Sequence, residues 1–241
     1  MKIDGRIAEK VINLKCVMFD LDGTLVDSIP GYFRLMEEIL NTVGLPPVPR
    51  EVVAEFMTGG LGVLEKMIPP ELSHRKETLI QECIAVGRSI SWNMFRNEVQ
   101  LFPGVEALFR LLGRQGILMA VVTSTERAFI DKKMIPLKRQ GLSDALSAVI
   151  TTGDAPRRKP APDPLVVCAR RLNVAPAQCV YIGDSYVDIR AGTAAGMMTI
   201  GVLSGLDDRP ILSKENPTLI LESVADVHAC FEGIFASDRN L

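Results

Sequence analysis

The chain has 241 residues, of which 47% are hydrophobic and 23% are charged, and this composition is sufficient for a sizeable buried core. Its formal net charge is only -2, which gives no sign of the basic surface that binds nucleic acid, and no apolar run approaches the roughly 18 residues that cross a bilayer. We therefore expect a globular protein that binds neither nucleic acid nor a membrane.

The cysteines and the first residues of the chain bear on its location in the cell. The five cysteines are scattered, with no Cys-x-x-Cys pair, so we expect buried free thiols. Free thiols are typical of a reducing compartment, and residues 1–15 lack the long apolar centre of a signal peptide. Both features predict a cytoplasmic protein. The two histidines, His74 and His228, are far apart in sequence, which argues against a histidine-based site.

The first expected strand runs directly into a pair of carboxylates. Residues 16–20 begin as a short apolar run typical of a buried strand, and Asp20, Asp22 and Gly23 follow in close succession. Two carboxylates placed this close resist each other's ionisation, a cost that a divalent cation with oxygen ligands would offset. Asp and Gly are also ordinary turn residues, so these positions alone do not distinguish a metal site from a polar turn.

Helical spacing dominates the next part of the chain. Residues of the helix-capping type precede Pro30, and apolar residues at helical spacing continue until Gly44. From residue 51 to about residue 97 the pattern stays helical and shows no clean strand alternation. The sequence therefore predicts a small all-helical domain over residues 29–100.

Beyond residue 100 the pattern alternates between strands and helices. Apolar runs of strand length occur at residues 117–122, 148–151, 179–182, 197–202 and 218–221. This alternation predicts an α/β fold, in which helices cover both faces of a parallel sheet built from residues 1–28 and 101–241. Because ligands of open parallel sheets bind beyond the carboxyl ends of the strands, we expect the helical domain to cover that edge.

Polar side chains follow several of the predicted strands and would meet at this edge. In chain order they are Thr123 and Ser124, then Lys159, then Asp184 with Asp188 about one helical turn later. Each could separately be a turn residue, a helix cap or part of a solvated loop. Since each falls at the carboxyl end of a predicted parallel strand, a shared site explains the positions of these residues better than a separate structural role for each one.

Together with the first two carboxylates, these residues could bind a cation and a phosphate and could catalyse one reaction. Asp20, Asp184 and Asp188 can hold a small hard cation such as Mg²⁺, while Lys159 and the hydroxyl groups can hold a phosphate. One carboxylate can attack phosphorus, and a second, two residues further on, can protonate the leaving oxygen and later activate water. The sequence therefore indicates cation-assisted phosphoryl transfer.

With these motifs the chain resembles the haloacid dehalogenase-like hydrolase superfamily, and its phosphatase branch in particular. DLDGTLVDS at residues 20–28 is similar to the first motif of the family, Thr123 to the second, Lys159 in RKPAPDP to the third, and GDSYVDIRAG at residues 183–192 to the fourth. The resemblance implies a Rossmann-like core with an inserted helical cap that closes over the substrate. Dehalogenases of the family lack the second acid of Asp-x-Asp, so the presence of Asp22 favours phosphate chemistry.

The resemblance also implies a role for each matching acid. Asp20 would be the nucleophile and a Mg²⁺ ligand. Asp22 would be the general acid and base, with its backbone carbonyl on the metal. Asp184 would bind Mg²⁺, directly or through water, and Asp188 would support the acidic cluster.

The remaining matches imply a site for the phosphoryl group and a reaction. Thr123, with Ser124 beside it, would bind the transferring phosphoryl group, and Lys159 would pair with both nucleophile and phosphate. The implied reaction is hydrolysis of a small phosphomonoester through an aspartyl-phosphate, as in phosphoglycolate phosphatases. A phosphomutase of the β-phosphoglucomutase type shares every core motif and stays open as an alternative, as does a non-catalytic binding protein on the same scaffold.

The helical insert would select the substrate, a small phosphorylated metabolite. Arg34, Arg88 and Arg96 lie in this insert, and each could contact an anionic substrate group or simply be solvated. The sequence does not decide between these alternatives, and it is compatible with a monomer or a homodimer.

Overall fold

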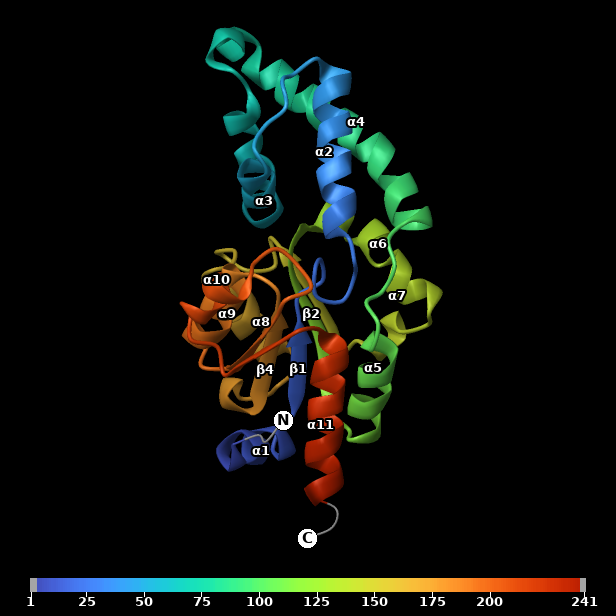
Figure 1. Ribbon diagram of the computed structural model, residues 1–241, viewed down its shortest axis with the longest axis vertical. Coiled ribbons are helices and arrows are strands. Elements are labelled where there is room, and N and C mark those ends of the chain that lie inside the picture. The colour runs from blue at the N-terminus through green and yellow to red at the C-terminus, as the bar shows by residue number, and fades with distance from the viewer. Residues whose placement is uncertain (1–3, 239–241) are drawn as a thin grey trace.

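The core of the molecule is a six-stranded parallel sheet, seen in a computed structural model that describes residues 4–238 (Figure 1). The strands lie in the order β3-β2-β1-β4-β5-β6 and are β1 (Cys16–Phe19), β2 (Leu118–Glu126), β3 (Ala148–Thr152), β4 (Cys179–Gly183), β5 (Met198–Val202) and β6 (Leu219–Leu221). Every neighbouring pair is parallel, which confirms the predicted sheet. Because β1 is central, the residue that follows it lies in the middle of the carboxyl edge.

Helices cover both faces of this sheet (Figure 1). The longer core helices are α5 (Val105–Arg114) and α11 (Val224–Asp238), which pack together on one face, and α8 (Asp163–Arg171) and α9 (Tyr186–Ala194) on the other. The shorter ones are α1 (Gly5–Ile12), α6 (Ile130–Lys133), α7 (Ile135–Arg139) and α10 (Arg209–Ser213), with 3₁₀ turns at Arg127–Phe129, Ser143–Ala145 and Pro176–Gln178. The core is thus the expected α/β, Rossmann-like fold.

Alternate side chains of β1 are buried on opposite faces of the sheet. Val17 and Phe19 belong to the apolar cluster that includes α5 and α11, whereas Cys16 and Met18 belong to the cluster that includes α8. Phe19 also stacks on Phe109 of α5, with 5.5 Å between the ring centroids. Burial on both faces explains why β1 reads as a continuous apolar run.

The insert between β1 and α5 is helical throughout. It contains α2 (Ile29–Val43), α3 (Arg50–Gly59), α4 (Lys76–Asn97) and 3₁₀ helices at Gly60–Met67 and Pro70–Arg75. Pro30 lies in the first turn of α2, and Gly44, with a φ of 78°, ends that helix in the left-handed conformation that glycine adopts easily. The insert lies beyond the carboxyl ends of the strands (Figure 1), as the position of the insertion predicts.

Two linkers join the insert to the core side by side. Val26 and Leu101 form an isolated antiparallel bridge, and the backbone N–H of Asp27 donates to the carbonyl of Gln100 at 2.9 Å. The chain therefore leaves the core and returns to it at one place, next to the acidic residues that follow β1.

The length of β2 differs from the sequence prediction. The strand does not end at Val122 but continues to Glu126, with irregular pairing to β3 between these two residues. Thr123 and Ser124 therefore belong to the last part of the strand and not to a following loop. The prediction was wrong because it was based on apolar residues, and this part of β2 is polar.

Helix α1 was not predicted from the sequence. Its first turn is capped by Asp4, whose side chain accepts a hydrogen bond from the backbone N–H of Arg6 at 2.9 Å. Val11 of this helix is fully buried in the core. The helix lies at the amino end of the sheet, far from the carboxyl edge (Figure 1), and so contributes nothing to the candidate site.

Candidate active site

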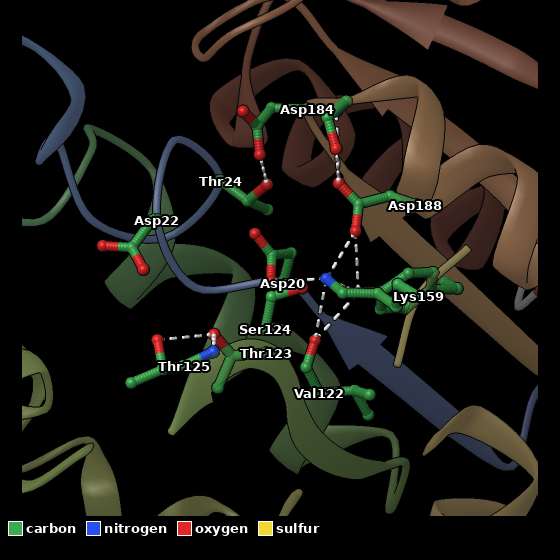
Figure 2. Close-up of polar contacts among 12 residues, drawn as sticks. Asp20, Asp22, Thr24, Val122, Thr123, Ser124, Thr125, Lys159, Asp184 and Asp188 are labelled. Carbon is green, nitrogen blue, oxygen red and sulfur yellow. Dashed lines mark hydrogen bonds and ion pairs between the residues drawn. The ribbon is translucent and has the colours of Figure 1, made fainter. Parts of the chain in front are cut away.

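Asp20 is held at the middle of the carboxyl edge by the sheet itself. It directly follows β1, and its backbone N–H donates to the carbonyl of Ile182 at 2.8 Å, which extends the hydrogen bonding between β1 and β4 by one residue. The residue is only 8% exposed. Its Oδ1 accepts a hydrogen bond from Nζ of Lys159 at 2.8 Å, so both its backbone and its carboxylate are fixed (Figure 2).

Lys159 is buried, and its ammonium donates hydrogen bonds to several oxygen atoms. Besides Asp20, Nζ lies 2.6 Å from Oδ1 of Asp188 and 2.9 Å from the hydroxyl oxygen of Tyr181. Burial disfavours the charged form, but the carboxylates of Asp188 and Asp20 outweigh it and raise the pKa of Lys159. The ammonium therefore stays charged and joins Asp20 to helix α9.

Three carboxylates share this buried centre. One oxygen from each of Asp20, Asp184 and Asp188 lies within 4.8 Å of the other two. Oδ1 of Asp184 accepts a hydrogen bond from the hydroxyl of Thr24 at 3.0 Å, and Oδ2 accepts one from the N–H of Leu206 at 2.8 Å (Figure 2 shows Asp184 with Thr24). The structure thus brings Asp20, Asp184 and Asp188 together, as their positions after parallel strands predict.

The electrostatics of this cluster favour a bound cation. Burial raises the pKa of Asp20 to about 7, although Lys159 opposes the rise. Burial and the negative charges of Asp188 and Asp20 raise the pKa of Asp184 well above its ordinary value. A hard divalent cation bound by these oxygens would offset that cost, so the donor set fits Mg²⁺.

Two glycines let the backbone approach Asp184. A Cβ atom on Gly23, whose φ is 77°, would collide with the carboxylate of Asp184, and a Cβ atom on Gly205 would collide with the same group. Asp184 cannot easily move aside, because both of its oxygens accept hydrogen bonds. The packing of these glycines therefore fixes where the acidic cluster lies.

Asp188 supports the cluster from the first turn of α9. Its Oδ2 accepts hydrogen bonds from the N–H and the hydroxyl of Ser185, at 3.1 and 2.5 Å, in a capping box at the start of the helix. Its Oδ1 faces Lys159. Asp188 therefore fixes the start of α9 and the lysine at the same time.

Asp22 lies apart from the other acids. Its carboxylate points away from Asp20 (Figure 2), where Oδ1 accepts a hydrogen bond from the hydroxyl of Ser28 at 2.7 Å. Oδ2 lies 2.5 Å from Nζ of Lys133 in α6, and both side chains of this ion pair are largely buried. The side chain of Asp22 therefore does not belong to the group of oxygens that could hold a metal ion.

The hydroxyl groups at the end of β2 line the same centre. Thr123 is 5% exposed, and its hydroxyl donates to Oγ1 of Thr125 at 3.0 Å while accepting the N–H of Thr125 at 3.2 Å (Figure 2). Ser124 lines the pocket, and its carbonyl accepts a hydrogen bond from Thr152 at 2.8 Å. The extension of β2 beyond Val122 thus places these hydroxyls beside Asp20.

A single pocket connects the acidic centre to the helical insert. Its core side contains the predicted residues Asp20, Asp22, Thr123, Ser124, Lys159 and Asp184. Its insert side is largely apolar, with side chains from α2, α4 and the segment at residues 56–64. The guanidinium of Arg158 donates to the carbonyl of Gly59 and so joins the core to the end of α3. Of the insert arginines considered from the sequence, Arg88 lines this pocket.

Comparison with known proteins identifies the family. A family model described as haloacid dehalogenase-like hydrolase matches residues 17–202, which span every predicted site residue. The chain is a haloacid dehalogenase-like hydrolase. A phosphoglycolate phosphatase of Neisseria meningitidis is 31% identical to this hydrolase over 224 residues, covering 90% of this chain and 93% of that protein. Together they show that the chain is a phosphoric monoester hydrolase of this family.

Solved structures agree with the fold of this haloacid dehalogenase-like hydrolase. A predicted phosphoglycolate phosphatase from Haemophilus somnus matches with a TM-score of 0.77 and 25% identity, covering 89% of this chain and 96% of that chain. A β-phosphoglucomutase candidate from Thermotoga maritima matches with a TM-score of 0.68 and 23% identity, covering 91% and 99%. The second likeness concerns the fold alone. Among residues 4–238 no helix is long and apolar enough to cross a membrane.

The hydrolase also has pocket residues that the sequence interpretation missed. Lys132 and Lys133 stand in the polar run DKK, where lysines usually belong to a solvated surface, yet both line the pocket. Thr125 was missed because the strand was taken to end earlier. The two threonines of the Thr-Ser-Thr run at residues 123–125 were the available signal, since β-branched residues are common in strands.

Proposed function

We propose that this hydrolase is a Mg²⁺-dependent phosphatase that cleaves a small phosphomonoester of the phosphoglycolate type through an aspartyl-phosphate on Asp20. The observation that supports it best is the buried cluster of Asp20, Asp184 and Asp188, with Lys159 paired to two of them. The phosphoglycolate phosphatase from Neisseria supports the substrate class. We also propose a cytoplasmic protein with a core of residues 1–28 and 101–241 and a cap of residues 29–100.

The first step transfers the phosphoryl group to Asp20. Lys159 binds Oδ1 of Asp20, which leaves Oδ2 to attack phosphorus. A bond forms between Oδ2 and phosphorus while the ester P–O bond breaks, and its electron pair goes to the leaving oxygen. Asp22 gives that oxygen its proton, so the alcohol leaves neutral.

The second step returns Asp20 to its starting state. Asp22 takes a proton from water, whose oxygen attacks phosphorus as the bond to Oδ2 breaks and inorganic phosphate forms. Thr123 and Ser124 donate hydrogen bonds to the phosphoryl oxygens, and Lys159 offsets their charge. Asp20, Asp184 and the backbone carbonyl of Asp22 would hold Mg²⁺, which when bound would supply further charge neutralisation.

The geometry of Asp22 sets a condition on both proton transfers. Its carboxylate must leave Ser28 and Lys133 and turn toward the centre occupied by Asp20. Tyr32 of α2 lies against Lys133, with 4.8 Å from Nζ to the ring centroid, so this turn and the position of the insert are linked. Closure of the insert would exclude bulk water while the aspartyl-phosphate exists.

The proposal is tested by phosphate release from 4-nitrophenyl phosphate. Release should require Mg²⁺ and stop when a chelator is added, and Asp20→Asn should lower kcat by about a thousandfold or more. Asp27→Asn is the matched control, because Asp27 is exposed and lies outside the site. Metal-independent turnover, or near-normal turnover by Asp20→Asn, would refute the mechanism.

A second assay separates hydrolysis from phosphoryl transfer to sugar. The purified protein is given 2-phosphoglycolate and, separately, β-glucose 1-phosphate, and both phosphate release and isomerisation are measured. We expect release from 2-phosphoglycolate and no isomerisation. Formation of glucose 6-phosphate would favour the phosphomutase alternative.

A further inference from the structure

Two further cations stand in the wall of the pocket where the core meets the insert. Lys132 lies in α6 of the core and Arg88 in α4 of the insert, and both line the pocket that contains Asp20. Phe129 lies beneath both, with 4.7 Å from its ring centroid to Nζ of Lys132 and 5.6 Å to the guanidinium carbon of Arg88. The two cations therefore form one cluster that spans core and insert.

Lys132 is buried without an anionic partner. The residue is 7% exposed, and its ammonium donates to the hydroxyl of Ser91 in α4, which is neutral. The neighbouring Lys133 differs, because it pairs with Asp22. In the part of the chain that the structure describes, no carboxylate forms an ion pair with Lys132, although Glu126 lines the same pocket. A buried charge of this kind is rare unless something else neutralises it.

The charges around Lys132 also indicate that its ammonium lacks an anionic partner among the described residues. Burial, and then the positive charges of Lys133 and Arg88, lower the pKa of Lys132 to about 8, and Asp22 offsets only part of this. The fold thus keeps an ammonium where desolvation and two like charges oppose it. The attraction of an anion bound beside Lys132 would offset the cost of burial and the repulsion between the cations, which is the situation expected at a recognition site.

We propose that Lys132, Arg88 and Ser91 form a subsite for a second anionic group of the substrate, separate from the phosphoryl site at Asp20. This inference rests on the proposed phosphatase function and assigns the residues that would bind the second anionic group of the substrate, which is a carboxylate or a second phosphate. Both groups are oxyanions, which an ammonium and a guanidinium bind through charge-assisted hydrogen bonds. The apolar wall of the pocket offers a neutral monoester no equivalent contact.

Matched substrate pairs test this subsite. 2-Phosphoglycolate and 2-hydroxyethyl phosphate have the same length and differ only in the carboxylate, as do 3-phosphoglycerate and glycerol 3-phosphate. Fructose 1,6-bisphosphate and fructose 6-phosphate differ in a second phosphate. The measured quantity is the preference, defined as kcat/KM for the doubly anionic member divided by kcat/KM for the other. The pair with the largest preference identifies the second group.

Substitutions in the cluster should lower the preference. We expect Lys132→Met to lower it by about 10- to 100-fold, chiefly by raising KM for the doubly anionic substrate, and Arg88→Met by about 3- to 10-fold. Lys138→Met is the matched control, because Lys138 is an exposed lysine outside the pocket, and it should keep the wild-type preference. Arg88 is also exposed, so its variant tests the subsite even if Lys132→Met folds poorly.

The outcomes separate this inference from the function on which it rests. An unchanged preference in both Lys132→Met and Arg88→Met would overturn the subsite alone. A wild-type protein that hydrolyses none of these monoesters with Mg²⁺ would overturn the proposed function and the subsite with it. A reduced preference in both variants, with Lys138→Met unchanged, would establish the subsite.

Discussion

Nζ of Lys133 lies 2.5 Å from Oδ2 of Asp22, and this ion pair holds the proposed proton donor turned away from Asp20. Burial disfavours the charge on Lys133, but the carboxylate of Asp22 outweighs it and raises the pKa of Lys133. The same ammonium also faces Tyr32 in the insert, so one side chain contacts both the proposed acid and the insert.

The role of Asp22 predicts a dependence on the leaving group. In Asp22→Asn no proton is available for the leaving oxygen, so kcat/KM for 2-phosphoglycolate should fall by about 10²- to 10⁴-fold. The loss should be smaller for 4-nitrophenyl phosphate, because 4-nitrophenolate leaves without a proton. Steady-state kinetics with both substrates give the comparison. Equal losses on the two substrates would mean that Asp22 does not protonate the leaving group.

When metal is absent, removing one negative charge from the acidic cluster should stabilise the protein. Asn at position 184 can still accept the N–H of Leu206 and can donate to the hydroxyl of Thr24, while removing one charge from the cluster. In the presence of a chelator, we therefore expect Asp184→Asn to raise Tm at pH 7. Mg²⁺ should raise Tm of the wild-type protein and have little effect on the variant.

The sign of the pH dependence follows from the raised pKa of Asp184. A carboxyl whose pKa is higher in the folded state stabilises the fold below its unfolded pKa, and this contribution is lost as pH rises through the folded value. The advantage of Asp184→Asn in chelator should therefore grow between about pH 4 and neutrality. Denaturant unfolding at several pH values measures it, and an advantage that shrinks with rising pH would contradict the electrostatic explanation.

Gly205 should be intolerant of the smallest possible side chain. A Cβ atom there would collide with the carboxylate of Asp184, which is held by hydrogen bonds on both oxygens. We expect Gly205→Ala to lower kcat by about 100-fold or more and to weaken the Tm response to Mg²⁺. Gly113→Ala in α5 is the matched control, because nothing lies within 4 Å of its Cβ position and alanine favours a helix. Comparable activity of the two variants would refute the argument.

Lys132 should reduce stability while serving recognition. Its pKa of about 8 lies below the ordinary value of about 10.4, so the charged ammonium opposes folding below pH 8 and this cost disappears as pH rises toward 10.4. We expect Lys132→Met to raise the free energy of unfolding at pH 7 by about 1–3 kcal/mol. The gain should shrink above pH 8, and urea unfolding across this range measures it. A gain that is constant with pH would assign the effect to packing.

The sequence was sufficient to predict the position of site residues that lie at the ends of strands. Asp20 and Asp184 follow β1 and β4, which are neighbours in a parallel sheet, so their meeting requires no knowledge of side-chain packing. Lys159 was found in the same way, because the loop that carries it follows β3. The length of β2 was not predictable from apolar spacing, since the polar residues Thr123 to Glu126 pair irregularly with β3.

Site residues whose contacts depend on how the core packs against the insert could not be predicted from strand ends. Lys132 and Lys133 are adjacent and chemically identical, yet one contacts Ser91 of α4 and the other contacts Asp22. The two lysines have different partners because of how α6 packs between core and insert, and no local sequence pattern predicts this packing. The same holds for Asp22, whose motif position was clear but whose direction depends on Lys133.

The paired linkers at Val26 and Leu101 attach the insert to the core at a single point. Because both ends of the insert are tied at one point beside the sheet, helices between them can lengthen, shorten or be exchanged without shifting any strand register. The position of Asp20 at the end of β1 would then stay constant while the insert side of the pocket changes. Grafting a relative's insert between these two residues would therefore replace Arg88 and the apolar wall of the pocket, while Lys132, which belongs to α6 of the core, would stay in place.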